Sequence, residues 1–298
     1  MNVQNSRSLI PVSVLVLTRN EELNLEACLS CLTSFDEVIV LDSMSTDHTV
    51  EIAKKFGATV IQRVFDNFSA HKNWAISNIP IRNEWILMID ADERVENDLL
   101  EEIDRVVATN DIFIDGYYIA RKNIFDGVWI RYGGWYPDFQ MRLFRRGRAH
   151  YESRIVHEHV LLEGKEGYLK NSLLHHDFKG LERYFDRHNT YSSMEAVEAY
   201  RVLRNPENSS SYIQPSIFSR GPKRRRYLKL LAYRYLPFRP FFKFLWMYVF
   251  RLGFLDGRMG FRFCLLHTFY EYQVSLKLKE LDDPNSPLRE KYRDYIGG

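Results

Sequence analysis

The segment 85–93 has the sequence Trp-Ile-Leu-Met-Ile-Asp-Ala-Asp-Glu, an apolar run that ends abruptly in acidic residues. An uninterrupted apolar run of this length predicts a parallel strand buried on both faces. Because side chains alternate along a strand, Asp90 and Asp92 should lie on the same side of its carboxyl end, where open α/β sheets bind ligands. Two such carboxylates favour an Mg2+ or Mn2+ ion that holds a diphosphate. The alternative is a solvated turn in which Asp92 caps the next helix.

Strands and helices are predicted to alternate through the first part of the chain. Four apolar, β-prone segments are each followed by a segment with helical spacing. The predicted strands cover 11–17, 37–41, 58–64 and 85–90, and the predicted helices cover 24–33, a stretch ending near 56, 69–79 and 97–108. This alternation predicts an α/β fold with a mainly parallel sheet, flanking helices and right-handed crossovers.

The second half of the chain has a different residue composition. Residues 116–160 are aromatic and β-prone, which predicts antiparallel strands and loops that complete the sheet and cover the site, and helices resume around 180–203. The stretch 205–222 is rich in Ser, Asn and Pro, as is typical of a linker or mobile loop. We therefore expect a catalytic domain over 10–204, a linker over 205–222 and a helical region over 223–298.

Composition and simple motifs narrow the function classes. The net charge is only +2, so it points to no nucleic-acid partner, and the sequence lacks the glycine-rich loops that usually bind phosphate. Phosphate charge must therefore be met by a metal and by basic side chains. Cys28 and Cys31 form a C-x-x-C pair inside a helical pattern, which favours buried helix residues over a zinc or redox site. The low cysteine count and the lack of an apolar signal core favour a cytoplasmic protein.

Three motifs follow the predicted strands in order: T-R-N-E-E at 18–22, L-D-S-M-S-T-D at 41–47 and D-A-D-E at 90–93. Together they resemble the family-2 glycosyltransferases of the GT-A fold, a Rossmann-like fold that binds nucleotide sugars. The blocks G-G-W-Y-P-D-F-Q-M-R-L-F-R-R at 133–146 and V-H-E at 156–158 resemble bacterial enzymes that add a sugar, often β-glucose, to the lipopolysaccharide inner core. The resemblance implies an inverting transferase that uses a UDP-sugar, first of all UDP-glucose, with Mg2+ or Mn2+.

The resemblance also implies roles for single residues. The nucleotide would be held by the residues of the first two motifs, by a basic residue and by the first aspartate of D-A-D-E: Thr18, Asn20, Glu21, Glu22, Asp42, Lys72 and Asp90. Asp42 would accept from the uracil or ribose, although a turn residue that caps the next helix is the alternative. Lys72 could equally be a solvated lysine. Asp92 would be the direct metal ligand.

The later motifs are expected to complete the metal shell and the catalytic base. His157 would join Asp92 on the metal, with imidazole suiting Mn2+ better than Mg2+, or it would be a structural histidine. Asp138 is the expected general base for the acceptor hydroxyl, with Glu158 as the rival base or as the partner that orients His157. One or more of the nearby arginines would neutralise the leaving diphosphate, or they would form surface salt bridges: Arg142, Arg145 and Arg146.

The segment 237–272 is rich in aromatic and basic residues but too charged to span a bilayer, because Lys243 and Arg251 bound the apolar run 244–250. On a helix, Arg239, Lys243 and Arg251 would lie within about 120° of one another. Together with the basic run at 223–226, this pattern predicts an in-plane helix on the anionic inner face of the cytoplasmic membrane. A hairpin packed on the catalytic domain or in a homo-oligomer interface is the alternative.

The reaction itself leaves several alternatives open at this point. The acceptor would be a lipopolysaccharide-core or other envelope glycan, or else a polyprenyl-phosphate lipid or a protein. Nucleotidyl transfer also uses an α/β sheet with paired aspartates, but it favours a loop rich in glycine and lysine after the first strand, which T-R-N-E-E lacks. A sugar-nucleotide-binding protein without catalysis would not need both Asp92 and a base.

Overall fold

The computed structural model describes residues 8–152, 159–204, 228, 231–233, 236 and 238–296. The chain divides into two compact units: residues 1–129, 136–151 and 159–179 form the first, and residues 130–135, 152–158 and 180–298 form the second. The predicted linker 205–222 lies outside the described residues. The helix over 180–204, which the sequence analysis placed in the catalytic domain, belongs to the second unit.

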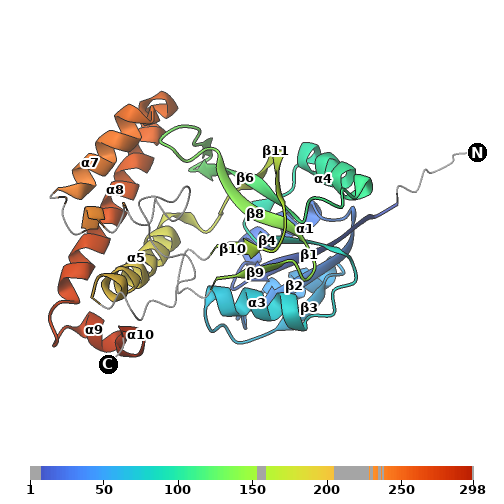
Figure 1. Ribbon diagram of the computed structural model, residues 1–298, viewed down its shortest axis with the longest axis horizontal. Coiled ribbons are helices and arrows are strands. Elements are labelled where there is room, and N and C mark those ends of the chain that lie inside the picture. Colours follow the sequence, from blue (N-terminus) through green and yellow to red (C-terminus); the bar gives the residue numbers. More distant parts are fainter. Residues whose placement is uncertain are drawn as a thin grey trace, which may run out of the picture. The chain divides into compact units, whose positions relative to one another are not determined.

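A large mixed sheet forms the centre of the first unit (Figure 1). Its strands follow the order β3-β2-β1-β4-β8-β6-β11-β5, and β7 pairs with β6. The bounds are β1 Ile10–Thr18, β2 Phe35–Asp42, β3 Thr59–Gln62, β4 Trp85–Asp90, β5 Glu93–Arg94, β6 Gly116–Phe125, β7 Val128–Trp129, β8 Asp138–Arg145 and β11 Glu166–His175. A separate two-stranded sheet pairs β9, Ala149–Tyr151, with β10, Val160–Leu162. The predicted α/β class is confirmed.

Helices α1 Glu22–Ser30, α2 Thr49–Lys55, α3 Phe68–Asn78 and α4 Asn97–Thr109 complete the first unit. The sheet is buried on both faces, as the apolar strands predict. Val14 and Leu87 belong to one core cluster, whereas their neighbours Leu15 and Met88 belong to the other. The predicted strand over 85–90 coincides with β4, and the antiparallel strands expected after 116 are present as β6, β7 and β8.

The strand directions bring several chain segments to one edge of the sheet. Strands β1, β2 and β4 are parallel and end at Thr18, Asp42 and Asp90, which are nearly level in the register. Strand β8 runs antiparallel to β4, so its first residue, Asp138, lies toward the same edge. Strand β6 is antiparallel to β8 and β11 is parallel to β6, so β11 also ends there, at His175.

The second unit is helical. It contains α5 Gly180–Arg204, α7 Arg239–Leu245, the π-helix η2 Trp246–Phe250, the 3-10 helix η3 Gly253–Asp256, α8 Gly257–Glu280, α9 Pro287–Lys291 and α10 Arg293–Ile296. Helix α5 packs on α8 through a core that includes Val197 and Val274. Glu195 on α5 accepts hydrogen bonds from the Tyr233 and Tyr270 hydroxyls, which ties this core together. None of the described helices combines the length and apolar character needed to cross a membrane.

Candidate active site at the carboxyl edge of the sheet

The turns after β1 and β2 are fastened to each other. The Asp42 carboxylate is fully buried and accepts from Thr18 Oγ1 at 3.0 Å, from the Ser45 amide at 2.9 Å and from Gln62 Nε2 at 3.1 Å, as well as from the Ser45 hydroxyl. These contacts fix the ends of both strands. Asp42 therefore anchors the turn, and its predicted contact with the nucleotide would add to an already occupied carboxylate.

Asn20 and Glu22 extend this connection between the two turns. Asn20 has a φ of 53°, a left-handed conformation that Asn adopts more easily than most residues. Its amide donates to Ser45 Oγ at 2.8 Å, and its side-chain oxygen accepts from the Thr46 amide at 2.9 Å. Glu22 accepts from the His48 amide at 3.2 Å. The two predicted nucleotide loops thus form one cross-linked wall beside the strand ends.

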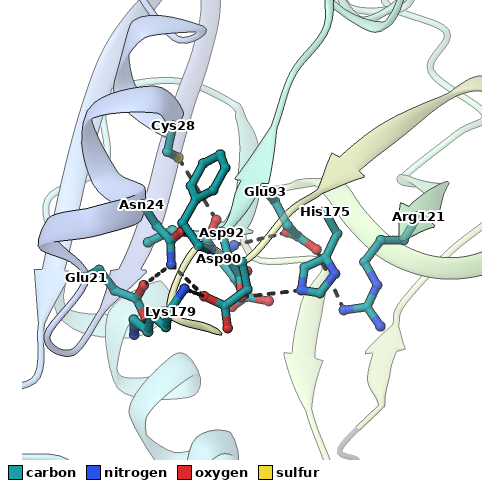
Figure 2. Close-up of polar contacts among 12 residues, drawn as sticks. Glu21, Asn24, Cys28, Asp90, Asp92, Glu93, Arg121, His175 and Lys179 are labelled. Carbon is teal, nitrogen blue, oxygen red and sulfur yellow. Dashed lines mark hydrogen bonds and ion pairs between the residues drawn. The ribbon is translucent and has the colours of Figure 1, made fainter. Parts of the chain in front are cut away.

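Glu21 belongs to a polar cluster that the sequence analysis did not foresee. Its carboxylate accepts from Asn24 Nδ2 at 2.8 Å and forms an ion pair with Lys179 (Figure 2). Asn24 also donates to Asp177 at 3.0 Å, so the chain segment after β11 is fastened to α1. Burial raises the pKa of Glu21; Asn24 and Lys179 act against that shift, and the charge of Asp92 adds to it.

Arg142 forms ion pairs with two of the acidic residues of the D-A-D-E motif. Its Nη2 donates to Asp90 Oδ2 at 2.8 Å and to Glu93 Oε1 at 2.6 Å, and Glu93 also accepts from the Asp90 amide at 3.0 Å. Arg142 and Glu93 are buried. Arg142 is therefore neither a surface salt bridge nor exposed to a diphosphate, because its guanidinium is committed to holding the motif in shape.

The charges around Asp90 favour its ionised form. Burial alone raises the pKa of Asp90, but the positive charges of Arg142 and Lys72 outweigh burial and the charge of Asp92, so the pKa lies below its ordinary value. Lys72, on α3, also places its Nζ 4.8 Å from the centre of the Tyr151 ring. Burial holds the pKa of Glu93 above its ordinary value, with Arg142 opposing.

Asp92 and His175 face each other across the site (Figure 2). Oδ2 of Asp92 lies 3.3 Å from Nε2 of His175, with 12% of the Asp92 side chain and 22% of the His175 side chain exposed. The Asp92 carbonyl oxygen accepts from the His176 amide at 2.9 Å, and His175 pairs with Glu93 where β5 joins β11. In the described part of the chain, the buried Nδ1 of His175 has no hydrogen-bond partner.

His157 and Glu158, the residues expected to complete the site, lie outside the described residues. His175 is the histidine that the structure places at Asp92. His175 was not predicted from the sequence because no strand was expected over 166–175, although Leu173-Leu174-His175 repeats the pattern of an apolar strand that ends in a polar residue. Within the described ranges, no three or more His, Cys, Asp or Glu side chains gather closely enough to hold a metal by themselves.

Asp138, the expected base, lies at the start of β8, directly after the cis peptide bond between Tyr136 and Pro137. Its Oδ2 accepts from Arg121 Nη2 at 3.1 Å and from Gln140 Nε2 at 3.2 Å, and 33% of the side chain is exposed. Arg121 Nη1 also lies 4.0 Å from Glu93 Oε1. Arg121 therefore links Asp138 to the D-A-D-E motif.

His71 is a further buried group close to the second loop. Its Nδ1 accepts from Arg63 at 2.8 Å, and its Nε2 lies 3.2 Å from the Ser43 hydroxyl. Burial and the charge of Arg63 lower the pKa of His71, so the ring is neutral and its Nε2 proton is directed at Ser43. This contact fixes α3, and with it Lys72, against the turn after β2.

Comparison with known proteins shows which family and relatives this chain is similar to. Residues 13–159 match the family described as Glycosyl transferase family 2. The chain is 27% identical over 221 residues to the lipopolysaccharide core biosynthesis glycosyltransferase LpsC of Rhizobium meliloti, which covers 70% of this chain and 79% of LpsC. It is 38% identical over 100 residues to an uncharacterized glycosyltransferase of Rickettsia typhi, which covers 33% of this chain and 34% of that protein.

The fold is also found in a solved structure. The mannosyltransferase PcManGT of Pyrobaculum calidifontis, solved in complex with GDP-Man and Mn2+, superposes with a TM-score of 0.51 at 13% identity. The superposition covers 92% of this chain and 88% of PcManGT. This likeness concerns the fold, and it confirms the expected GT-A architecture.

Proposed function

Because the match over residues 13–159 makes this chain a glycosyltransferase of family 2, we propose that it transfers a sugar with inversion from a UDP-sugar, first of all UDP-glucose, to a hydroxyl of a lipopolysaccharide-core glycan. The likeness to LpsC supports the acceptor class. The single observation that carries the proposal is the gathering of Asp92, His175, Asp90 and Asp138 at the carboxyl edge of the sheet.

Asp92 and His175 are the residues that would hold a divalent cation. Their Oδ2 and Nε2 atoms lie 3.3 Å apart, and a carboxylate with an imidazole is a donor set that suits Mn2+ at least as well as Mg2+. The remaining ligands would come from the diphosphate and water, since the described residues supply no third acidic or imidazole ligand. When bound, the cation would neutralise the charge that develops on the leaving diphosphate.

The chain's own residues prepare the donor side. The wall formed by 18–22 and 42–48 follows strands β1 and β2, where the nucleoside would lie in an open α/β sheet. Asp90, held ionised by Arg142 and Lys72, would accept from the ribose. Lys72 would add positive charge on the diphosphate side. These groups are fixed before the donor binds, which is the condition for electrostatic stabilisation without reorganisation.

Asp138 would act as the general base. The acceptor oxygen attacks the anomeric carbon, the bond from that carbon to the diphosphate oxygen breaks with its electron pair, and the hydroxyl proton passes to the Asp138 carboxylate. Both Asp138 contacts use Oδ2. In the described part of the chain Oδ1 has no donor, so it is the atom that would take the proton. Glu158 remains the rival base.

The acceptor class sets the place of action. A lipopolysaccharide core is built on a lipid, so the enzyme would work as a peripheral protein at the cytoplasmic face of the membrane. A polyprenyl-phosphate lipid would require the same location, whereas a protein acceptor would not. A homo-oligomer would be compatible with either acceptor.

A donor screen tests the proposal. Purified protein is incubated with UDP- and GDP-sugars, with Mg2+ or Mn2+, and release of the nucleoside diphosphate is measured with and without a lipopolysaccharide-core acceptor. We expect one UDP-sugar to be turned over faster when the acceptor is present. The absence of both binding and turnover with every donor would overturn the proposal, and turnover of a GDP-sugar alone would overturn the choice of UDP.

A further inference from the structure

The second unit carries an unusual concentration of exposed apolar side chains. Of the 30 exposed large hydrophobic residues in the described part of the chain, 14 lie between 238 and 276. They are Phe238, Phe241, Phe242, Trp246, Val249, Phe250, Leu252, Phe254, Leu255, Phe261, Leu265, Phe269, Tyr272 and Leu276. Single exposed apolar residues are ordinary, but a contiguous set of this size marks an interaction surface.

The elements that carry these side chains, α7, η2, η3 and α8, pack on one another. Helix α7 packs on α8, and the Tyr248 ring contacts both Phe254 and Phe261, at 6.2 Å and 5.6 Å between ring centres. Along α8 the exposed residues at 261, 265, 269, 272 and 276 fall within about 80° of one another, which makes a single apolar stripe. Trp246 and Phe250, 55% and 69% exposed, extend the surface onto η2.

Charge is distributed unequally along this surface. Arg251, Arg258 and Arg262 are exposed among the apolar residues at the end formed by η2, η3 and the first half of α8. The two acidic residues between 238 and 276 are engaged elsewhere. Asp256 accepts from the Arg131 and Tyr132 amides, and Glu271 pairs with Arg239 and Lys243. The opposite end of α8 and the residues after it carry charges of both signs: Lys277 and Lys279, with Glu280, Asp282 and Asp283.

We propose that this surface, defined as the apolar residues above together with Arg251, Arg258 and Arg262, is the lipid-binding face, and that the η2–η3 end enters the headgroup region of an anionic bilayer. The inference deepens the proposed function, since it names the surface by which the enzyme reaches a lipid-linked acceptor. Aromatic rings with interspersed arginines suit the boundary between acyl chains and anionic headgroups.

Charge complementarity decides between a bilayer and a second copy of this chain. In a symmetric dimer the surface would face its own copy and bring Arg251, Arg258 and Arg262 of both chains together, which is unfavourable unless acidic groups intervene. The surface offers no exposed acidic residue among its described members. Anionic headgroups supply the missing negative charge.

Vesicle co-flotation of the full chain tests the surface without donor or acceptor, so its result is independent of whether the proposed transfer reaction is correct. We expect binding to vesicles of phosphatidylglycerol and phosphatidylcholine at low salt, much weaker binding to phosphatidylcholine alone, and a salt-resistant remainder from the apolar groups. The triple variant Arg251→Gln, Arg258→Gln, Arg262→Gln should reduce partitioning about 5-fold for each arginine.

Matched variants distinguish binding through this surface from vesicle binding caused by the overall charge or hydrophobicity of the protein. The triple variant Arg183→Gln, Lys279→Gln, Arg293→Gln makes the same change in net charge at exposed positions outside the surface, and it should bind like the wild type. The pair Trp246→Ser, Phe250→Ser should remove the salt-resistant remainder. The pair Val64→Ser, Ile112→Ser, at positions of the first unit that are more exposed than Trp246 and Phe250, should not.

Equal losses in the test and control variants would overturn the proposal, as would a full chain that fails to float at low salt. Sedimentation velocity without lipid tests the alternative, in which the surface is an interface between two copies of this chain. A dimer that Trp246→Ser, Phe250→Ser dissociates, together with no vesicle binding, would identify the surface as an interface between copies. Circular dichroism of each variant guards against loss of folding as the cause.

Discussion

Nε2 of His175 lies 3.3 Å from Oδ2 of Asp92, although 82 positions of sequence separate the two residues. The contact arises because β11 ends beside the turn that follows β4, through the short pairing of β5 with β11. The apolar sequence pattern predicts β4, the strand that precedes Asp92. His175 ends β11, the last strand of this sheet in chain order, and no local sequence pattern predicts that β11 ends beside Asp92.

The first prediction concerns this pair. Asp92→Asn and His175→Ala should each abolish transfer and weaken Mn2+ binding, because each removes one of the two protein ligands proposed for the cation. Calorimetry of Mn2+ binding in the presence of UDP measures the second effect directly. His176→Ala is the matched control, since His176 is the neighbouring histidine and its ring packs on Phe178 at 4.2 Å between ring centres.

Activity at the wild-type level in either variant, with an unchanged metal optimum, would refute the metal role. If Asp92→Asn alone lost metal affinity, His175 would be a group that orients Asp92 rather than a ligand.

The sequence predicts the strand ends well because each strand is buried on both faces and each motif is local. The apolar segments that end in Thr18, Asp42 and Asp90 identify themselves as buried strands. The alternation of strands and helices predicts that these strands are parallel. The links between segments are different. Arg142 contacts Glu93, Lys179 contacts Glu21, and His175 contacts Asp92. Each contact joins chain segments that the order of the strands brings together, and local periodicity does not specify that order.

The second prediction concerns the base. Asp138→Asn should lower kcat by about 100- to 10,000-fold and leave the Kd of the donor nearly unchanged, because a general base acts in the chemical step. Gln140→Ala is a suitable comparison, since it removes the neighbouring hydrogen bond at 3.2 Å without removing the carboxylate. Single-turnover rates and donor titration separate the two quantities. A large loss of donor affinity would place Asp138 in the donor site and favour Glu158 as the base.

The third prediction concerns stability. Arg142→Met should destabilise the fold by about 3–5 kcal/mol, because it leaves the fully buried Glu93 carboxylate without its main countercharge. The double variant Arg142→Met, Glu93→Gln should recover part of that loss. Urea unfolding measures both free energies. If the single variant were as stable as the wild type, the buried ion pair would not hold the D-A-D-E motif, and the ionised state of Asp90 would need another cause.

The fourth prediction is a pH dependence in the second unit. The His267 ring packs against Trp135 and Phe263 at 4.3 Å and 4.5 Å between ring centres. Burial lowers the pKa of His267 from 6.5 to about 3, with the charge of Lys243 acting in the same direction. The unfolded chain takes up a proton at this residue below pH 6.5, whereas the folded chain does so only near 3. The contribution of His267 to the free energy of unfolding is therefore fully present above pH 6.5. It falls as the pH decreases, by roughly 1.4 kcal/mol per pH unit.

His267→Phe should keep the ring contacts and remove this proton uptake, so the variant should lose less stability than the wild type between pH 6.5 and 4. Urea titrations followed by tryptophan fluorescence, with Trp135 as a reporter beside the ring, provide the comparison. His48→Phe is the control, because that histidine is exposed on the first unit. If both variants kept the wild-type slope, the acid sensitivity would come from other groups, and His267 would be protonated in the folded protein at a higher pH than its surroundings imply.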